Sequence, residues 1–176
     1  MRNPRRDQAG FTILELLMGV AILAVTLSIA VPSFSAMMRT NRLAGQVNEM
    51  VTAMNYARSE AYKRGVTVSV CATNTSGACA SSGTAWANGW LVITDPNNNG
   101  VTDTGETVLQ TFAAPVGNFT YSPTPSSSRF VGFRPLGVVS GATTSIDIYK
   151  SGCSGIEKRT ISVATTGRIS LAKVSC

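Results

Sequence analysis

The amino-acid sequence predicts an α+β protein in which one long N-terminal α-helix packs on a β-sandwich-like, antiparallel-sheet head. Residues 11–31 are apolar apart from Glu15 and a few small polar residues, and residues 32–64 repeat apolar positions at steps of three and four. Beyond residue 65 the chain is rich in Gly, Ser, Thr and Asn and contains short alternating runs, which is typical of β-strands joined by turns. The 176 residues suffice for one membrane helix and one modest globular domain.

The N-terminus combines a short basic leader with an apolar stretch of membrane-spanning length. Residues 1–10 hold three arginines, and residues 11–31 approach the roughly 20 residues that span a bilayer. A secretory signal would need a small-residue cleavage site after this stretch, but Pro32 follows directly. A simple signal anchor is the better alternative, although neither explains Glu15, because a carboxylate in hydrocarbon costs a few kcal/mol or more and needs a partner.

Gly10, Phe11 and Glu15, between the basic leader and Pro32, resemble the type IV prepilin signature. The resemblance implies that a prepilin peptidase cleaves between Gly10 and Phe11 and that Phe11 is then N-methylated. It also implies that Glu15 meets the N-terminal ammonium of a neighbouring subunit during assembly, since a buried carboxylate pairs or is neutralised. The implied organisation is a leader (1–10), a transmembrane and filament-core helix (11–31), an amphipathic continuation (32–64) and an extracytoplasmic head (65–176).

The long helix is predicted to change character at Pro32, which removes a backbone hydrogen bond and should kink or loosen it. Beyond this point apolar residues form one stripe, which we expect to pack against the head: Leu43, Val47, Met50, Met54, Ala57 and Ala61. Two cations and a glycine, Lys63-Arg64-Gly65, form a good helix end.

Alternating or buried apolar runs predict seven strands in the head, at residues 66–70, 89–94, 107–112, 129–133, 144–149, 159–164 and 168–174. Residues 74–84 and 115–128 are rich in small residues or in Pro, Ser and Thr, and they are predicted to be loops.

Several segments of the head carry a second resemblance. They are the segment from Asn55 to Ala61 that leads through Gly65 to Cys71, the Gly89-Trp90 strand, an Asp/Asn/Gly loop ending at Leu109, and Thr166-Gly167-Arg168. Together they resemble the GspH/FimT/FimU group of minor pilins and pseudopilins. This implies a FimU-like, low-copy structural subunit of a type IV pilus. The subunit would be held in the inner membrane with a periplasmic head, then moved to the cell surface, with minor and major pilins as partners. A minor pseudopilin of type II secretion is the alternative within the family.

Four cysteines in an exported domain are expected to form disulfides. Pairing Cys71 with Cys79 would staple a short loop, and pairing Cys153 with Cys176 would hold the C-terminus on the domain. Because the chain has no histidine, histidine-based catalysis and histidine metal ligands are excluded. Neither a nucleophile–base pair nor a cofactor site is apparent, so no enzymatic activity is predicted.

One loop fits the calcium-binding pattern D-x-[DN]-x-[DN]-G-x5-E. The possible ligands are Asp95, Asn97, Asn99, the Val101 carbonyl, Asp103 and Glu106. The flanking segments are predicted strands rather than helices, so an Asn/Gly-rich hairpin connection without a metal is the alternative.

Positive charge concentrates in the C-terminal third, where residues 121–176 hold seven bases and two acids. Some FimT-type members bind DNA through a C-terminal Gly-Arg-x-Arg motif, but here the second arginine is replaced by Ser170. Phosphate binding needs several cations on one face. The candidates for such a face are Lys158, Arg159, Arg168 and Lys173.

Overall fold

The computed structural model describes the whole chain except residues 1–10, 82, 141–143, 154 and 156, and the predicted leader therefore lies outside the described residues. Contacts divide the chain after Arg39 into two units, and residues 40–176 form the compact unit that contains the head. Helix α1 (Ile13–Arg64) belongs to both units, whereas all strands belong to the second.

Helix α1 begins after Thr12 and runs through Pro32 without a break in its assignment. Thr12 caps it, because its hydroxyl oxygen accepts a hydrogen bond from the Glu15 backbone N–H at 3.2 Å. At the other end Gly65 adopts a positive φ of 67°, and its N–H donates to the Ala61 carbonyl at 3.0 Å. The predicted glycine stop is therefore the observed one.

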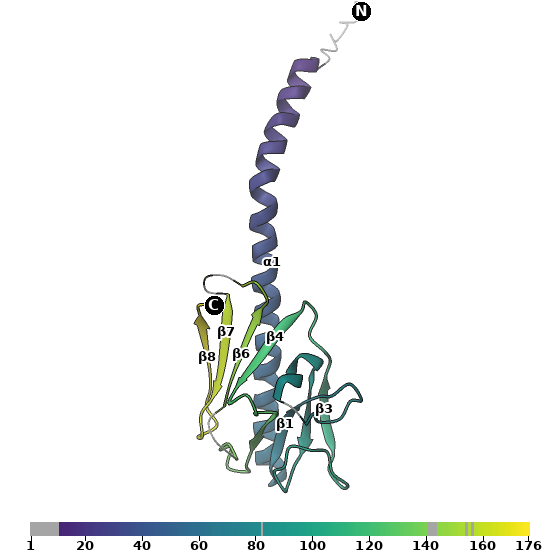
Figure 1. The fold of residues 1–176 in the computed structure, drawn as a ribbon, viewed down its shortest axis with the longest axis vertical. Helices are drawn as coiled ribbons and strands as arrows, with labels where there is room; N and C mark the ends of the chain where they lie inside the picture. Colours follow the sequence, from purple (N-terminus) through teal and green to yellow (C-terminus); the bar gives the residue numbers. More distant parts are fainter. Residues whose placement is uncertain (1–10, 82, 141–143, 154, 156) are drawn as a thin grey trace, which may run out of the picture. The chain divides into compact units, whose positions relative to one another are not determined.

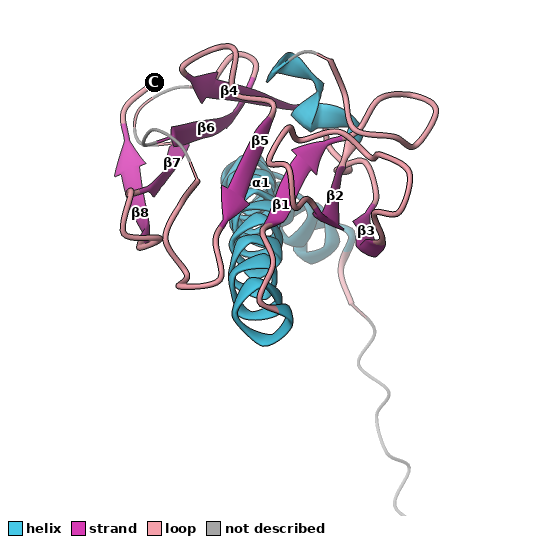
Figure 2. Cartoon of the chain, turned by 90° about the horizontal axis from the view of Figure 1, so that it is seen from below, coloured by secondary structure: helices cyan, strands magenta, loops and turns pink. Residues whose placement is uncertain are grey.

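The head contains two antiparallel four-stranded sheets, as Figure 1 shows. The first has the order β3-β2-β1-β5 and consists of β1 (Val68–Ala72), β2 (Trp90–Thr94), β3 (Val108–Phe112) and β5 (Phe130–Phe133). The second has the order β4-β6-β7-β8 and consists of β4 (Phe119–Thr124), β6 (Thr144–Lys150), β7 (Lys158–Val163) and β8 (Ile169–Val174). Seen from below, the strands of both sheets form an arc over one side of the head portion of α1 (Figure 2).

Two elements differ from the sequence predictions. Strand β4 lies in a segment whose composition predicts a loop, and the 3-10 helix η1 (Gly83–Asn88) begins at the end of the other predicted loop. In β4 the side chains of Phe119, Tyr121 and Pro123 are buried and alternate with more exposed polar ones. The Pro, Ser and Thr content obscures this period of two, and Pro123 is tolerated because β4 is an edge strand.

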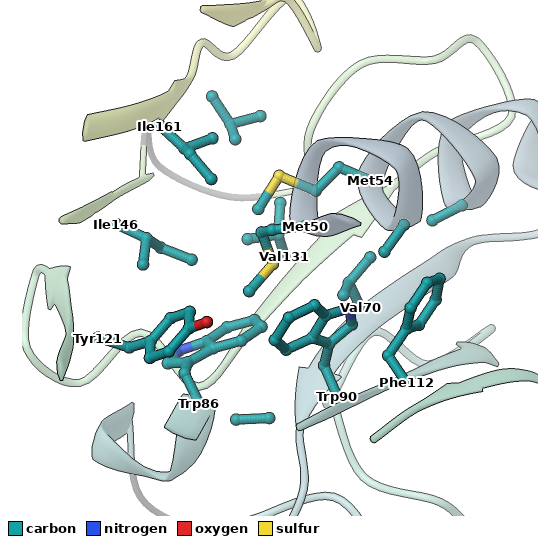
Figure 3. Close-up of a cluster of buried hydrophobic side chains, with 14 of the residues drawn as sticks. Met50, Met54, Val70, Trp86, Trp90, Phe112, Tyr121, Val131, Ile146 and Ile161 are labelled. Atoms are coloured by element: carbon teal, nitrogen blue, oxygen red, sulfur yellow. The ribbon is translucent and has the colours of Figure 1, made fainter. Parts of the chain in front are cut away.

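One buried core joins the helix to both sheets. The predicted helix stripe from Leu43 to Ala61 is buried throughout. Met50 and Met54 point from α1 toward Val131 of the first sheet and Ile161 of the second, while Trp90 stacks on Phe112 (Figure 3). The hydroxyl of Tyr121 donates to the Gln46 side chain at 3.4 Å. Burial, and to a smaller extent the negative charge of Glu49, raises the pKa of the Tyr121 hydroxyl. This core fixes the sheets on the last turns of the helix.

Candidate functional site

The N-terminal part of α1 presents apolar side chains outward on all sides. Every described residue from Phe11 to Arg42 is exposed except Ala36, which is half-buried, and Phe11 itself is 87% exposed. An 18-residue window of the helix has a mean hydropathy of 2.4 with none of it buried, which is long and apolar enough to cross a membrane by length and composition. Such a surface needs lipid or other helices around it.

Three hydroxyl groups in this segment donate hydrogen bonds within the helix itself. Thr26 donates to the Leu23 carbonyl at 2.9 Å, Ser28 to the Val25 carbonyl at 2.7 Å, and Ser35 to the Pro32 carbonyl at 2.8 Å. These bonds leave no hydroxyl of the three unsatisfied, as a lipid-facing helix requires. This feature goes beyond the sequence predictions above, although Ser and Thr inside an apolar helical run signal it.

Glu15 lies in the first turn, at the third residue of the assigned helix. A carboxylate at this position interacts favourably with the positive end of the helix dipole. Thr12 and Glu15 have the spacing of a capping box, a local role that the prepilin resemblance does not assign. Within the described part of the chain, Glu15 takes part in none of the ion pairs, and its side chain is exposed. The described residues of the chain therefore supply no ion-pair partner for Glu15.

The loop that fits the calcium pattern covers the outer face of the first sheet, opposite the face that packs on the helix. Asp95 is fully buried there and accepts hydrogen bonds from the Ser69 hydroxyl at 2.6 Å and from the Asn99 and Gly100 backbone N–H groups. Gly100 approaches Phe130 so closely that a Cβ would lie 2.2 Å from its ring. The loop is thus attached to the sheet at both its start and its centre.

The remaining candidate ligands mostly bond to one another. Asn97 and Asn99 both donate their side-chain amides to the same Asp103 oxygen, at 2.9 and 2.7 Å. These two bonds, Asn97 first, lower the pKa of the Asp103 carboxyl. Glu106 accepts from the Asp103 backbone N–H at 2.9 Å. These oxygens and amides thus bond within the loop that joins the antiparallel strands β2 and β3, and among the described residues no three Cys, Asp or Glu side chains gather.

The four cations proposed for DNA do not form one surface. In β7 and β8, Arg159 lies directly opposite Lys173, on the sheet face that carries the core residues. Lys158 points to the other face, where it pairs with Asp147 at 3.1 Å. Arg168 precedes β8, five residues from Lys173, and so lies at the other end of the strand. Sequence proximity groups these residues in the prediction, but the pleat and the strand length separate them.

The Thr166-Gly167-Arg168 motif has a packing role. Gly167 has a φ of 77°, and a Cβ there would lie 1.9 Å from the Gly137 carbonyl oxygen and 3.3 Å from Arg58 Nε. The turn between β7 and β8 therefore rests on the turn after β5, beside the helix. Only glycine allows this approach.

The structure joins Cys71 to Cys79 and Cys153 to Cys176, the two pairings expected from the sequence. Cys71 and Cys79 belong to a small buried cluster with Leu91 and Ile93 on the outer face of the first sheet. The second bond holds the C-terminal residue, whose N–H also donates to the Gly155 carbonyl at 2.9 Å. Both bonds fix loops of the head rather than a reactive site.

The sequence matches the family model described as Type II transport protein GspH over residues 46–167, and the model of the prokaryotic N-terminal methylation motif over residues 5–31. Comparison with curated protein sequences gives no significant match.

Solved structures share the fold. The type IV minor pilin FimU of Pseudomonas aeruginosa is 21% identical, with a TM-score of 0.59 over 75% of this chain and 89% of that one. In a second crystal form FimU gives 22% identity and a TM-score of 0.53, over 74% and 90% of the chains. The minor pseudopilin EpsH from the Vibrio cholerae type 2 secretion system is 10% identical, with a TM-score of 0.51 over 75% and 97%. Both proteins are thus similar to this chain in the architecture of helix and head.

Proposed function

The chain belongs to the GspH family of minor pilins and pseudopilins, and within it we propose a FimU-like, low-copy subunit that primes assembly or lies near the tip of a type IV pilus. As a member of this family it is a structural subunit rather than an enzyme. The observation that carries the proposal is the N-terminal segment. Phe11 and Glu15 lie at the start of a helix whose apolar side chains are exposed and in which the hydroxyls of Thr26, Ser28 and Ser35 donate to backbone carbonyls of the same helix.

In the proposed mechanism, a prepilin peptidase cleaves after Gly10 in the inner membrane, and Phe11 becomes the methylated N-terminus. The helix then leaves the lipid for the bundle of helices in the filament. Glu15 has no ion-pair partner within the described part of its own chain, so an incoming register that offers the Phe11 ammonium of a neighbour is favoured over lipid. The pair supplies both a driving force and an alignment.

Glu15→Val tests this mechanism in cells that assemble the pilus. We expect normal amounts of the protein in the membrane fraction and a large loss from sheared filaments, because insertion needs the apolar surface and incorporation needs the carboxylate. Thr12→Val is the matched control, since it removes the capping acceptor for the Glu15 N–H and keeps the carboxylate. Equal incorporation of Glu15→Val and wild type would contradict the assembly role. Equal losses in both variants would reduce Glu15 to a capping residue.

Deletion separates a pilus subunit from a pseudopilin. Loss of surface pili with intact protein export supports the proposal, whereas loss of type II secretion with intact pili supports the pseudopilin alternative.

For DNA uptake, the spread of the four cations favours the structural role, and we expect the head, residues 40–176, to bind duplex DNA only weakly at near-physiological salt. Salt-resistant binding that falls with Arg168→Ala and Lys173→Ala would favour the DNA-binding alternative.

A further inference from the structure

Strand β8 is an exposed sheet edge that lacks the protection given to the other three edges. Strand β5 is covered by residues 138–140, because Ser140 N–H donates to the Gly132 carbonyl at 2.9 Å. Strand β4 carries Pro123 and contacts η1, and the pairing of β3 is interrupted by a bulge opposite Val92 and Ile93. Such devices discourage pairing with another chain. β8 pairs regularly with β7 over its whole length, and in Figures 1 and 2 no described element lies beyond it.

The ladder identifies the backbone groups that β8 leaves unpaired. The Arg168 carbonyl accepts from the Ala164 N–H at 2.9 Å, so this pair faces inward. Hydrogen-bonded and non-hydrogen-bonded pairs alternate along an antiparallel ladder. The N–H and C=O groups of Ile169, Leu171 and Lys173 therefore point away from β7, in the spacing that a further strand needs.

The side chains of the same three residues share one face and define what such a strand should carry. Leu171 is 52% exposed, Ile169 is half-buried, and Lys173 is exposed beside Arg159, its opposite residue on β7. Among the described residues, none of the recorded ion pairs involves Lys173. The Lys173 ammonium disfavours a positively charged residue opposite it, and Leu171 favours an apolar side chain in the middle of the added strand.

We propose that β8 binds an extended segment of another polypeptide chain as an additional antiparallel strand. In the direction from N- to C-terminus that segment has an acidic residue opposite Lys173, then at steps of two residues apolar side chains opposite Leu171 and Ile169. Backbone hydrogen bonds supply affinity, and the alternate side chains supply selectivity. The second sheet thereby extends across two chains.

The test uses residues 40–176, since this compact unit holds every strand, both disulfides and the buried core. The probe is a short synthetic peptide with one glutamate followed at two-residue steps by two valines, with threonines between. We expect binding that slows amide hydrogen exchange at Ile169, Leu171 and Lys173, read by NMR. Replacing the glutamate by lysine in the peptide should weaken binding by about threefold or more.

Variants of the edge separate backbone pairing from charge. Leu171→Pro removes an N–H that points away from β7 and keeps the N–H groups that bond β8 to β7. It should therefore weaken peptide binding by about tenfold. Should that variant misfold, Lys173→Glu tests the edge independently, with an expected loss of about threefold to tenfold. Lys150→Glu, at the exposed end of β6, has the same charge change and should leave binding unaltered.

Binding that leaves the three amides unprotected, or equal losses for Lys173→Glu and Lys150→Glu, would overturn the proposal. So would the absence of binding at millimolar peptide. Protection of these amides that rises with protein concentration without peptide would show that a second copy of the chain occupies the edge, which would overturn the assignment of an acidic partner strand.

Discussion

Helix α1 has two portions with the same backbone and opposite surroundings. From Phe11 to Val31 its side chains are apolar nearly all round and exposed, whereas from Leu43 to Ala61 the apolar side chains form one stripe that is buried by the head. One polar contact differs in the same way. Hydroxyls of both portions bond to their own helix, but in the second portion a side-chain bond also reaches a strand of the head, where Gln46 accepts from Tyr121 on β4. The difference shows that the distribution of apolar residues, rather than helix propensity, determines what each portion binds.

The largest expected effect comes from a methionine in the buried portion. Met50→Ala should lower the free energy of unfolding by about 2–5 kcal/mol, because it opens a cavity between the helix and both sheets. Met37→Ala, at an exposed position N-terminal to Leu43, should change it by less than about 0.5 kcal/mol. The measurement is denaturant unfolding of the full chain in detergent, followed by the fluorescence of Trp86 and Trp90. Similar losses in both variants would refute the division of the helix.

The contact between the β7–β8 turn and the buried portion gives the next effect. Gly167→Ala should lower the free energy of unfolding by about 2–4 kcal/mol, since it places an alanine in the left-handed backbone conformation and its Cβ clashes with the Gly137 carbonyl. Gly152→Ala has nearly the same φ, 76°, with nothing within 4 Å, and should cost only about 1–2 kcal/mol. The comparison of their thermal unfolding isolates the clash. Equal costs would mean that the turn moves away freely.

The exposed portion of the helix contains Glu15 and the buried portion contains Glu60, and of these two only Glu60 forms ion pairs within the described chain. Arg64 at 2.8 Å, then Lys63 at 3.0 Å, lower the pKa of Glu60 below its usual 4.5. A carboxylate whose pKa is lower in the folded than in the unfolded protein stabilises the fold at pH values above its unfolded-state pKa. This contribution is lost as the pH falls through the folded-state pKa. We expect the free energy of unfolding, taken from unfolding curves between about pH 5 and 3, to fall less steeply with decreasing pH for Glu60→Gln than for wild type. Parallel curves would show that the pairs contribute nothing.

The smallest effect concerns two exposed helix glycines, at each of which an added Cβ would meet nothing within 4 Å. Gly45→Ala should stabilise the head by about 0.5–1 kcal/mol, because it lowers the entropy of the unfolded chain. Gly19→Ala should leave unfolding of the head unchanged, since that portion of the helix lies outside the compact unit. Equal stabilisation by both substitutions would mean that the helix unfolds as one piece with the head.

Some elements are predictable because a local pattern decides them. The buried stripe, the glycine stop at Gly65 and the strands at β2 and β3 follow from periodicity and turn residues alone, whereas β1 lies two residues beyond its predicted bounds and is buried on both faces. Strand β4 escapes prediction because its proline and serines outweigh the alternation of Phe119, Tyr121 and Pro123. Its assignment depends on pairing with β6, a partner distant in sequence.

The sequence by itself determined the N-terminal motif, the membrane-length apolar segment and the amphipathic continuation, because each depends on spacing along the chain. Tertiary structure alone decided that Asp95 is buried under its loop, that Lys158 faces away from Lys173, and that β8 remains an open edge. Strand order and register depend on contacts between distant segments, and the free energy of those contacts is not encoded in any local pattern.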